Sequence, residues 1–195
     1  MLRLVLPALA ALLLAFACDN AAPDQAPSRT PQPTTAPSPT PDAGAVDSRP
    51  GSTDPLTVRP NPDPPVEAIT QVATRIGLHP EAGGWDRIVF EFDRGLPQAD
   101  ISYVESVFSC GPGELVPVQG GAILAVRMLA QAHNDQGMST IPARQLSGQG
   151  GVIVEAKMYC DFEGHLDWAI GLKAKKPFKV TTLSNPTRLV IDIKQ

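Results

Sequence analysis

The sequence has few of the side chains that build reactive centres. Only three of its 195 residues are histidine and three are cysteine, and aromatic residues make up 5% of the chain. The histidines stand singly, without a second histidine or an acid at the interval of a zinc site, so we predict no metal ion. A Gly-x-Ser-x-Gly nucleophile motif is lacking as well. We therefore expect no catalytic residue, no cofactor and no enzymatic activity.

The sequence also lacks a surplus of positive charge. Its 16 Lys and Arg residues are outnumbered by 20 Asp and Glu residues, which gives a formal net charge of -4. Such a chain offers no basic field to attract nucleic acid. We expect no nucleic-acid partner.

An apolar run at the N-terminus points to export. Residues 4–14 follow Arg3 and are too few to span a membrane comfortably, but they suit the core of a signal peptide. Ala15 and Ala17, two small residues on either side of Phe16, then precede Cys18, so that ordinary signal peptidase and the lipobox cleavage of bacterial lipoproteins would both cut before this cysteine. We predict a signal peptide at 1–17 and an exported protein. In the lipobox interpretation, a lipid on Cys18 anchors the protein to the extracytoplasmic side of the cell membrane.

The cysteine count supports this interpretation. Unpaired thiols are uncommon in an oxidising compartment, and lipid attachment would remove Cys18 from an odd total of three. Cys110 and Cys160 remain, each at the end of a predicted strand. We predict a disulfide between them, which would stabilise the fold by about 3 to 5 kcal/mol in the chain-entropy model. Two separately buried thiols are the alternative.

Residues 18–65 form a predicted linker. From residue 23 onward, Pro, Thr, Ser, Ala and Asp predominate, and such a segment buries too little apolar surface to offset the entropy lost on ordering. We expect a disordered tether that reaches on the order of 100 Å when extended. A single folded domain is predicted at 66–195.

The domain has the alternating apolar and polar pattern of β-strands, interrupted by Gly and Pro. We predict an all-β fold, a small antiparallel β-sandwich of about eight strands. Residues 120–132 are rich in good helix formers, so a helix is the alternative there. Residues 131–151 show little alternation and are expected to form a long surface loop. The predicted strands are 69–78, 87–92, 101–108, 123–129, 152–159, 166–172, 178–183 and 189–193.

Two segments of this domain share one design. Residues 86–92 (DRIVFEF) and 187–193 (TRLVIDI) both follow the order polar, Arg, apolar, Val, apolar, acidic, apolar. Alternation places Arg87 and Arg188, with the Val and the acid of each segment, on one face, and the apolar residues on the other. The Arg and the acid could pair along the outer face of each strand, or they could simply be solvated.

The C-terminal segment 178–192, with its Pro-x-Arg-apolar-Val-apolar-Asp strand, resembles the end of the AMIN domain. Together with the DRIVFEF strand, the loop at 132–140 and the DFEG turn at 161–164, it makes residues 66–195 similar to the AMIN-like domain of actinobacterial-type lipoproteins. AMIN domains accompany cell-wall amidases and secretin-type envelope proteins. The resemblance implies a wall-binding or envelope-targeting module.

Binding is therefore the expected role. The candidate ligand residues are the aromatic and basic side chains Trp85, Tyr103, Arg87 and Arg188, because aromatic faces stack on sugars and on partner side chains. Trp168 lies in mid-strand and is expected to be packed. We expect the partner to be peptidoglycan or another cell-wall glycan. The alternative is an interaction or scaffold lipoprotein that binds an envelope protein and no glycan.

Overall fold

The computed structural model describes residues 51–60, 68–80 and 83–195. The predicted signal peptide at 1–17, the predicted lipidation site Cys18 and most of the predicted linker lie outside the described residues. The described residues form twelve strands: β1 Leu56–Val58, β2 Gln71–His79, β3 Trp85–Phe92, β4 Ala99–Val104, β5 Val107–Phe108, β6 Leu115–Val116, β7 Ala122–Leu129, β8 Gln145–Ser147, β9 Ile153–Phe162, β10 His165–Leu172, β11 Phe178–Leu183 and β12 Thr187–Lys194.

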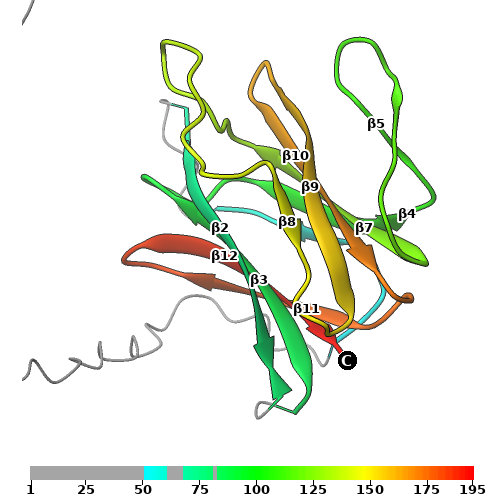
Figure 1. The fold of residues 1–195 in the computed structure, drawn as a ribbon. Coiled ribbons are helices and arrows are strands. Elements are labelled where there is room, and N and C mark those ends of the chain that lie inside the picture. The colour runs from blue at the N-terminus through cyan, green and yellow to red at the C-terminus, as the bar shows by residue number, and fades with distance from the viewer. Residues whose placement is uncertain (1–50, 61–67, 81–82) are drawn as a thin grey trace, which may run out of the picture. The chain divides into compact units, whose positions relative to one another are not determined.

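Two antiparallel sheets pack face to face (Figure 1). One has six strands in the order β1-β4-β7-β10-β9-β8, and the other has four in the order β11-β12-β3-β2. This arrangement confirms the predicted all-β antiparallel sandwich. Each of the eight predicted strands is found, and residues 120–132 contain β7 where a helix was the alternative. The described residues include no helix long and apolar enough to cross a membrane.

The structure differs from the prediction in its shortest elements. The predicted strand 101–108 is divided into β4 and β5, and β8 interrupts the predicted loop 131–151. The folded region also begins before residue 66, because β1 pairs with β4 and Ser52 forms a bridge with Phe178 of β11. Part of the predicted disordered linker, residues 51–60, is therefore packed on the domain. Strands of two or three residues are too short for a period of two to be recognisable.

The core lies between the two sheets and follows the alternation predicted from the sequence. On β3, every second residue from Ile88 to Phe92 is buried. On β12, Leu189, Ile191 and Ile193 are buried in the core, and the two residues between them on the other face are buried as well. Trp168 of β10 is fully buried, as expected, with its ring centre 5.6 Å from that of Phe90 on the facing sheet. Its indole Nε1 donates to Oε1 of the buried Gln71, 3.0 Å away. The largest core side chain is thus both packed and hydrogen-bonded.

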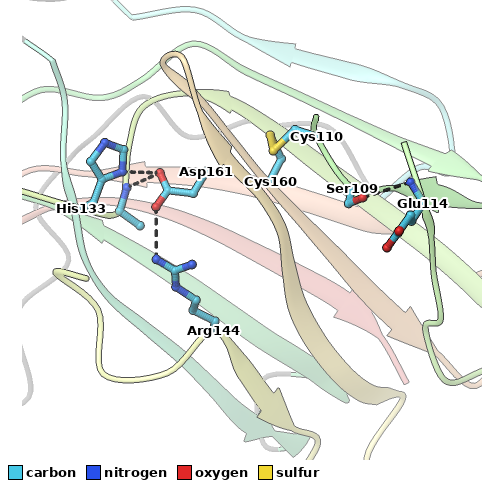
Figure 2. Close-up of a disulfide and its surroundings, with 8 residues drawn as sticks. Ser109, Cys110, Glu114, His133, Arg144, Cys160 and Asp161 are labelled. Carbon is cyan, nitrogen blue, oxygen red and sulfur yellow. Dashed lines mark hydrogen bonds and ion pairs between the residues drawn. A yellow bond between two sulfur atoms is a disulfide. The ribbon is translucent and has the colours of Figure 1, made fainter. Parts of the chain in front are cut away.

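A second, smaller core lies on the outer face of the six-stranded sheet. The β5–β6 hairpin packs there, so that Val107 is buried together with Ala125 and Ala169. The predicted disulfide is present and fastens this hairpin to β9, with the Cα atoms of Cys110 and Cys160 5.2 Å apart (Figure 2). A cross-link over a separation of 50 residues stabilises the folded state by about 4 kcal/mol in the chain-entropy model.

Two polar groups are buried beside this smaller core. Tyr159 Oη and Asp167 Oδ1 have no hydrogen-bond partner among the described residues. Burial is the main reason why the pKa of Asp167 is raised above its usual value, and the nearby Arg127 and His165 act in the opposite direction. Burial likewise raises the pKa of Tyr159, and the charge of Asp167 adds to this effect. An ionised Asp167 is therefore a cost to stability.

The first prediction follows from that cost. Because folding raises the pKa of Asp167, the contribution of this carboxyl to stability is complete below its unfolded pKa of 3.8. That contribution is lost as the pH rises through the pKa of the folded state. The uncharged isostere in Asp167→Asn should make the protein more stable than wild type at pH 7, with the difference vanishing below pH 3.8. Urea unfolding at both pH values measures this. Asp135→Asn, at an exposed position, is the control and should change little. A variant less stable than wild type at pH 7 would show that ionised Asp167 stabilises the fold.

Candidate functional site

The two segments with the shared pattern meet on the outer face of the four-stranded sheet. The segments 86–92 and 187–193 lie on adjacent antiparallel strands, β3 and β12, and pair with each other. Because the two patterns run in opposite directions, the Arg of each segment faces the acid of the other. The structure thus pairs these residues across the strands and not along them. Neighbours on this outer face are Trp85 with Lys194, Arg87 with Asp192, Val89 with Val190, and Glu91 with Arg188.

Arg87 and Asp192 form a bidentate ion pair. Arg87 Nε lies 2.6 Å from Asp192 Oδ1, and Nη2 lies 2.9 Å from Oδ2. The carboxylate is almost completely covered, with 3% of its side chain exposed, while 37% of Arg87 remains exposed. The hydrogen bond to Asp192 raises the pKa of Arg87 although burial opposes this. Arg87 therefore uses two of its five N–H donors within the sheet face, where its pairing with Asp192 fixes the position of its side chain.

Arg188 occupies the equivalent place in the second segment but has a different environment. Its opposite neighbour Glu91 forms an ion pair with Arg75 of β2, with Nη1 and Oε2 3.0 Å apart. Arg188 Nε donates instead to the carbonyl oxygen of Pro186, 3.2 Å away. It forms no ion pair with another described residue. Arg188 is consequently a cation available at the surface.

Trp85 is the first residue of β3 and is half-buried on this face. Two ammonium groups flank its ring, with Lys179 Nζ 4.4 Å and Lys194 Nζ 5.3 Å from the ring centre. Gly51 closes one end of the indole, since a Cβ atom at Gly51 would lie 2.9 Å from Trp85 Cη2. The two lysines come from β11 and β12, and sequence reasoning missed them because their proximity to Trp85 depends on strand pairing.

The charge on this face opposes that of the whole chain. Alternation and register place five cationic and two anionic side chains here, a surplus of three positive charges. The chain as a whole carries -4. A flat sheet face with an aromatic ring and surplus cations suits an extended, negatively charged ligand. The cations are Arg75, Arg87, Lys179, Arg188 and Lys194, and the anions are Glu91 and Asp192.

Tyr103, the fourth predicted binding residue, is separated from the other three. It belongs to β4 of the six-stranded sheet, and its ring packs against Phe178 with centres 6.2 Å apart. Its hydroxyl donates to Lys176 O at 2.6 Å and accepts from Lys176 N at 3.0 Å. Burial raises its pKa, whereas the backbone hydrogen bond lowers it. These contacts make Tyr103 an anchor for the segment before β11.

His133 and Asp161 form a contact that the sequence did not reveal (Figure 2). His133 Nδ1 and the backbone N of Ala132 lie 2.9 and 3.0 Å from Asp161 Oδ1, and Arg144 Nη2 lies 3.7 Å from Oδ2. Ser139, which bridges to His133, donates its hydroxyl to the carbonyl oxygen of Ile141. The cluster fixes the loop that contains His133. The described residues include no group of three His, Cys, Asp or Glu side chains placed to hold a metal ion.

The fold and this surface together define a class of protein. It is a small antiparallel β-sandwich with a charged sheet face, on which two lysines lie over the indole of Trp85. Within that class, the family model of the AMIN-like domain matches residues 68–195, and the chain belongs to the AMIN-like domain family. No curated protein and no solved structure matches the chain.

The equivalent arginines of the two segments, Arg87 and Arg188, should differ in their contribution to stability. Asp192→Ala leaves Arg87 without its bidentate partner, and we expect it to lower the free energy of unfolding by about 2 kcal/mol. Arg188→Gln, at the equivalent position without an ion pair, should change it by less than about 0.5 kcal/mol. Urea unfolding measures both variants. Equal losses would contradict the structural role assigned to the Arg87–Asp192 pair.

Proposed function

We propose that the protein is a non-catalytic module that binds peptidoglycan or another cell-wall component. Membership of the AMIN-like family supports an envelope-associated binding role. The observation that carries the proposal is the gathering of Trp85, Arg87 and Arg188 on one outward face. Residues from two distant segments thus form one continuous surface.

The chemistry of this surface fits a glycan polymer. The exposed part of the Trp85 indole offers apolar contact area to the C–H groups of a sugar, and the ammonium groups over the ring can pair with acidic substituents. The side chains stand on hydrogen-bonded strands whose other face is the domain core, so the surface is held rigid. An extended polymer can lie along such a face without a deep cavity.

Tethering forms part of the same proposal. Export, lipid attachment at Cys18 and a linker would hold the domain outside the cell membrane within reach of the wall. Gly51, the first described residue, lies against Trp85 at the rim of the proposed binding face. The membrane partner is then the lipid anchor, and the sheet face remains available to the wall.

A second candidate is an envelope protein as the partner. Phe108 and Leu115 are cross-strand neighbours on the β5–β6 hairpin and are 53% and 64% exposed. Exposed apolar pairs of this kind favour protein contacts. Their location on the hairpin, away from the charged sheet face, allows the two candidates to be separated by mutation.

Co-sedimentation of the full chain, solubilised in detergent, with purified peptidoglycan tests the proposal. The wild-type protein should sediment with the polymer, and Trp85→Ala should weaken binding about fivefold through loss of the stacking face. Phe108→Ala is the matched control, because it removes an exposed aromatic ring from the hairpin and should bind as wild type does.

The opposite result has a defined meaning. A wild-type protein that stays in the supernatant, or equal binding by wild type and Trp85→Ala, would contradict glycan binding on this face. In that case, crosslinking to an envelope protein in intact cells that is lost in Phe108→Ala would support the second candidate.

A further inference from the structure

We propose that the ligand of the four-stranded sheet is a polymer with widely spaced carboxylates, and that one carboxylate binds between Lys179 and Lys194 beside Trp85. This inference rests on the proposed function and adds to it the charge of the ligand and the place where the charge is held. The juxtaposition of two ammonium groups at one indole carries the argument.

The charges of these two lysines are poorly compensated within the described structure. Lys179 Nζ lies 3.7 Å from Asp192 Oδ2, but that carboxylate is already paired with Arg87 at 2.6 Å. Lys194 Nζ donates to the carbonyl oxygen of Gly83 and has no acidic partner among the described residues. Both ammonium groups lie within 5.3 Å of the centre of one ring, and an anion that contacts both would offset their positive charge.

Each lysine retains donors for a ligand. An ammonium group has three N–H donors. Lys194 uses one of them on Gly83, and Lys179 lies 3.7 Å from one oxygen of Asp192. The side chain of Lys179 is 34% exposed, so its head is within reach of solvent. An incoming carboxylate could therefore accept hydrogen bonds from both lysines while the adjoining sugar or peptide contacts the indole.

The spacing of the free cations favours a polymer with separated charges. Arg188 and Lys194 are six residues apart on the same face of β12, which corresponds to roughly 20 Å along a strand. Between them lies Val89, which is half-buried and uncharged, opposite the buried Val190. A polymer with a phosphate on every repeat would place an unmatched charge over Val89. A glycan with peptide side chains and isolated carboxylates fits the pattern better.

The test compares two forms of peptidoglycan from which attached phosphate polymers have been removed. One retains its carboxylates, and in the other they have been converted to amides. The full chain should bind the first form about tenfold more tightly than the second. The double variant with Lys179→Gln and Lys194→Gln should bind the native form about as weakly as wild type binds the amidated one, and it should not distinguish the two forms.

A second lysine pair provides the control. Lys157 and Lys173 each donate to a backbone carbonyl, as Lys194 does, but they belong to the six-stranded sheet or its margin. The double variant with Lys157→Gln and Lys173→Gln changes the net charge by the same amount and should keep wild-type binding. Circular dichroism of both double variants confirms that they are folded.

Each outcome has a separate consequence. Equal binding of wild type to native and amidated peptidoglycan overturns the carboxylate site and leaves the proposed function standing. Binding neither to these two forms nor to cell walls that keep their phosphate polymers overturns the proposed function itself. Binding that returns only when the phosphate polymers are left in place shows that phosphate is the anion and overturns the carboxylate assignment. The comparison of native with amidated peptidoglycan uses the wild-type protein alone, so it tests the carboxylate site even if the double lysine variant is unstable.

Discussion

The antiparallel register between β3 and β12 is the constraint on which the rest of the structure depends. It places Ile88 opposite Ile191 in the core and, on the other face, Arg87 opposite Asp192. A shift of one residue would turn the charged residues inward and the apolar residues outward, so the buried face keeps the register fixed. The same register sets Lys194 beside Trp85. Core and proposed binding surface are two consequences of one pairing.

The outer face of the six-stranded sheet is partly apolar and is covered by a hairpin. The outer face of the six-stranded sheet contains apolar residues such as Ala125 and Ala169, which the β5–β6 hairpin covers. A two-stranded hairpin is barely stable alone, and the Cys110–Cys160 bond holds this one in place. The two sheets thus differ in their outer faces: a hairpin packs on that of the six-stranded sheet, and that of the four-stranded sheet contains charged residues.

Local patterns in the sequence were sufficient for the fold but not for the site. Alternation over long strands predicted the sandwich and the burial of Trp168, and the cysteine count predicted the disulfide. The contacts of the site depend on pairing between strands: Arg87 and Asp192 are separated by 105 residues. No local pattern specifies such a register, so Lys179 and Lys194 could not be placed at Trp85 beforehand. The contact of His133 with Asp161 was missed for the same reason.

The proposed ligand surface is formed by β11, β12 and β3. The most direct measurement is a map of backbone amide chemical shifts of the full chain during titration with a soluble peptidoglycan fragment. The account predicts that the largest shifts occur around Trp85, Lys179 and Lys194, with smaller ones near Arg188. Shifts confined to the β5–β6 hairpin, with the sheet face unchanged at saturation, would contradict it.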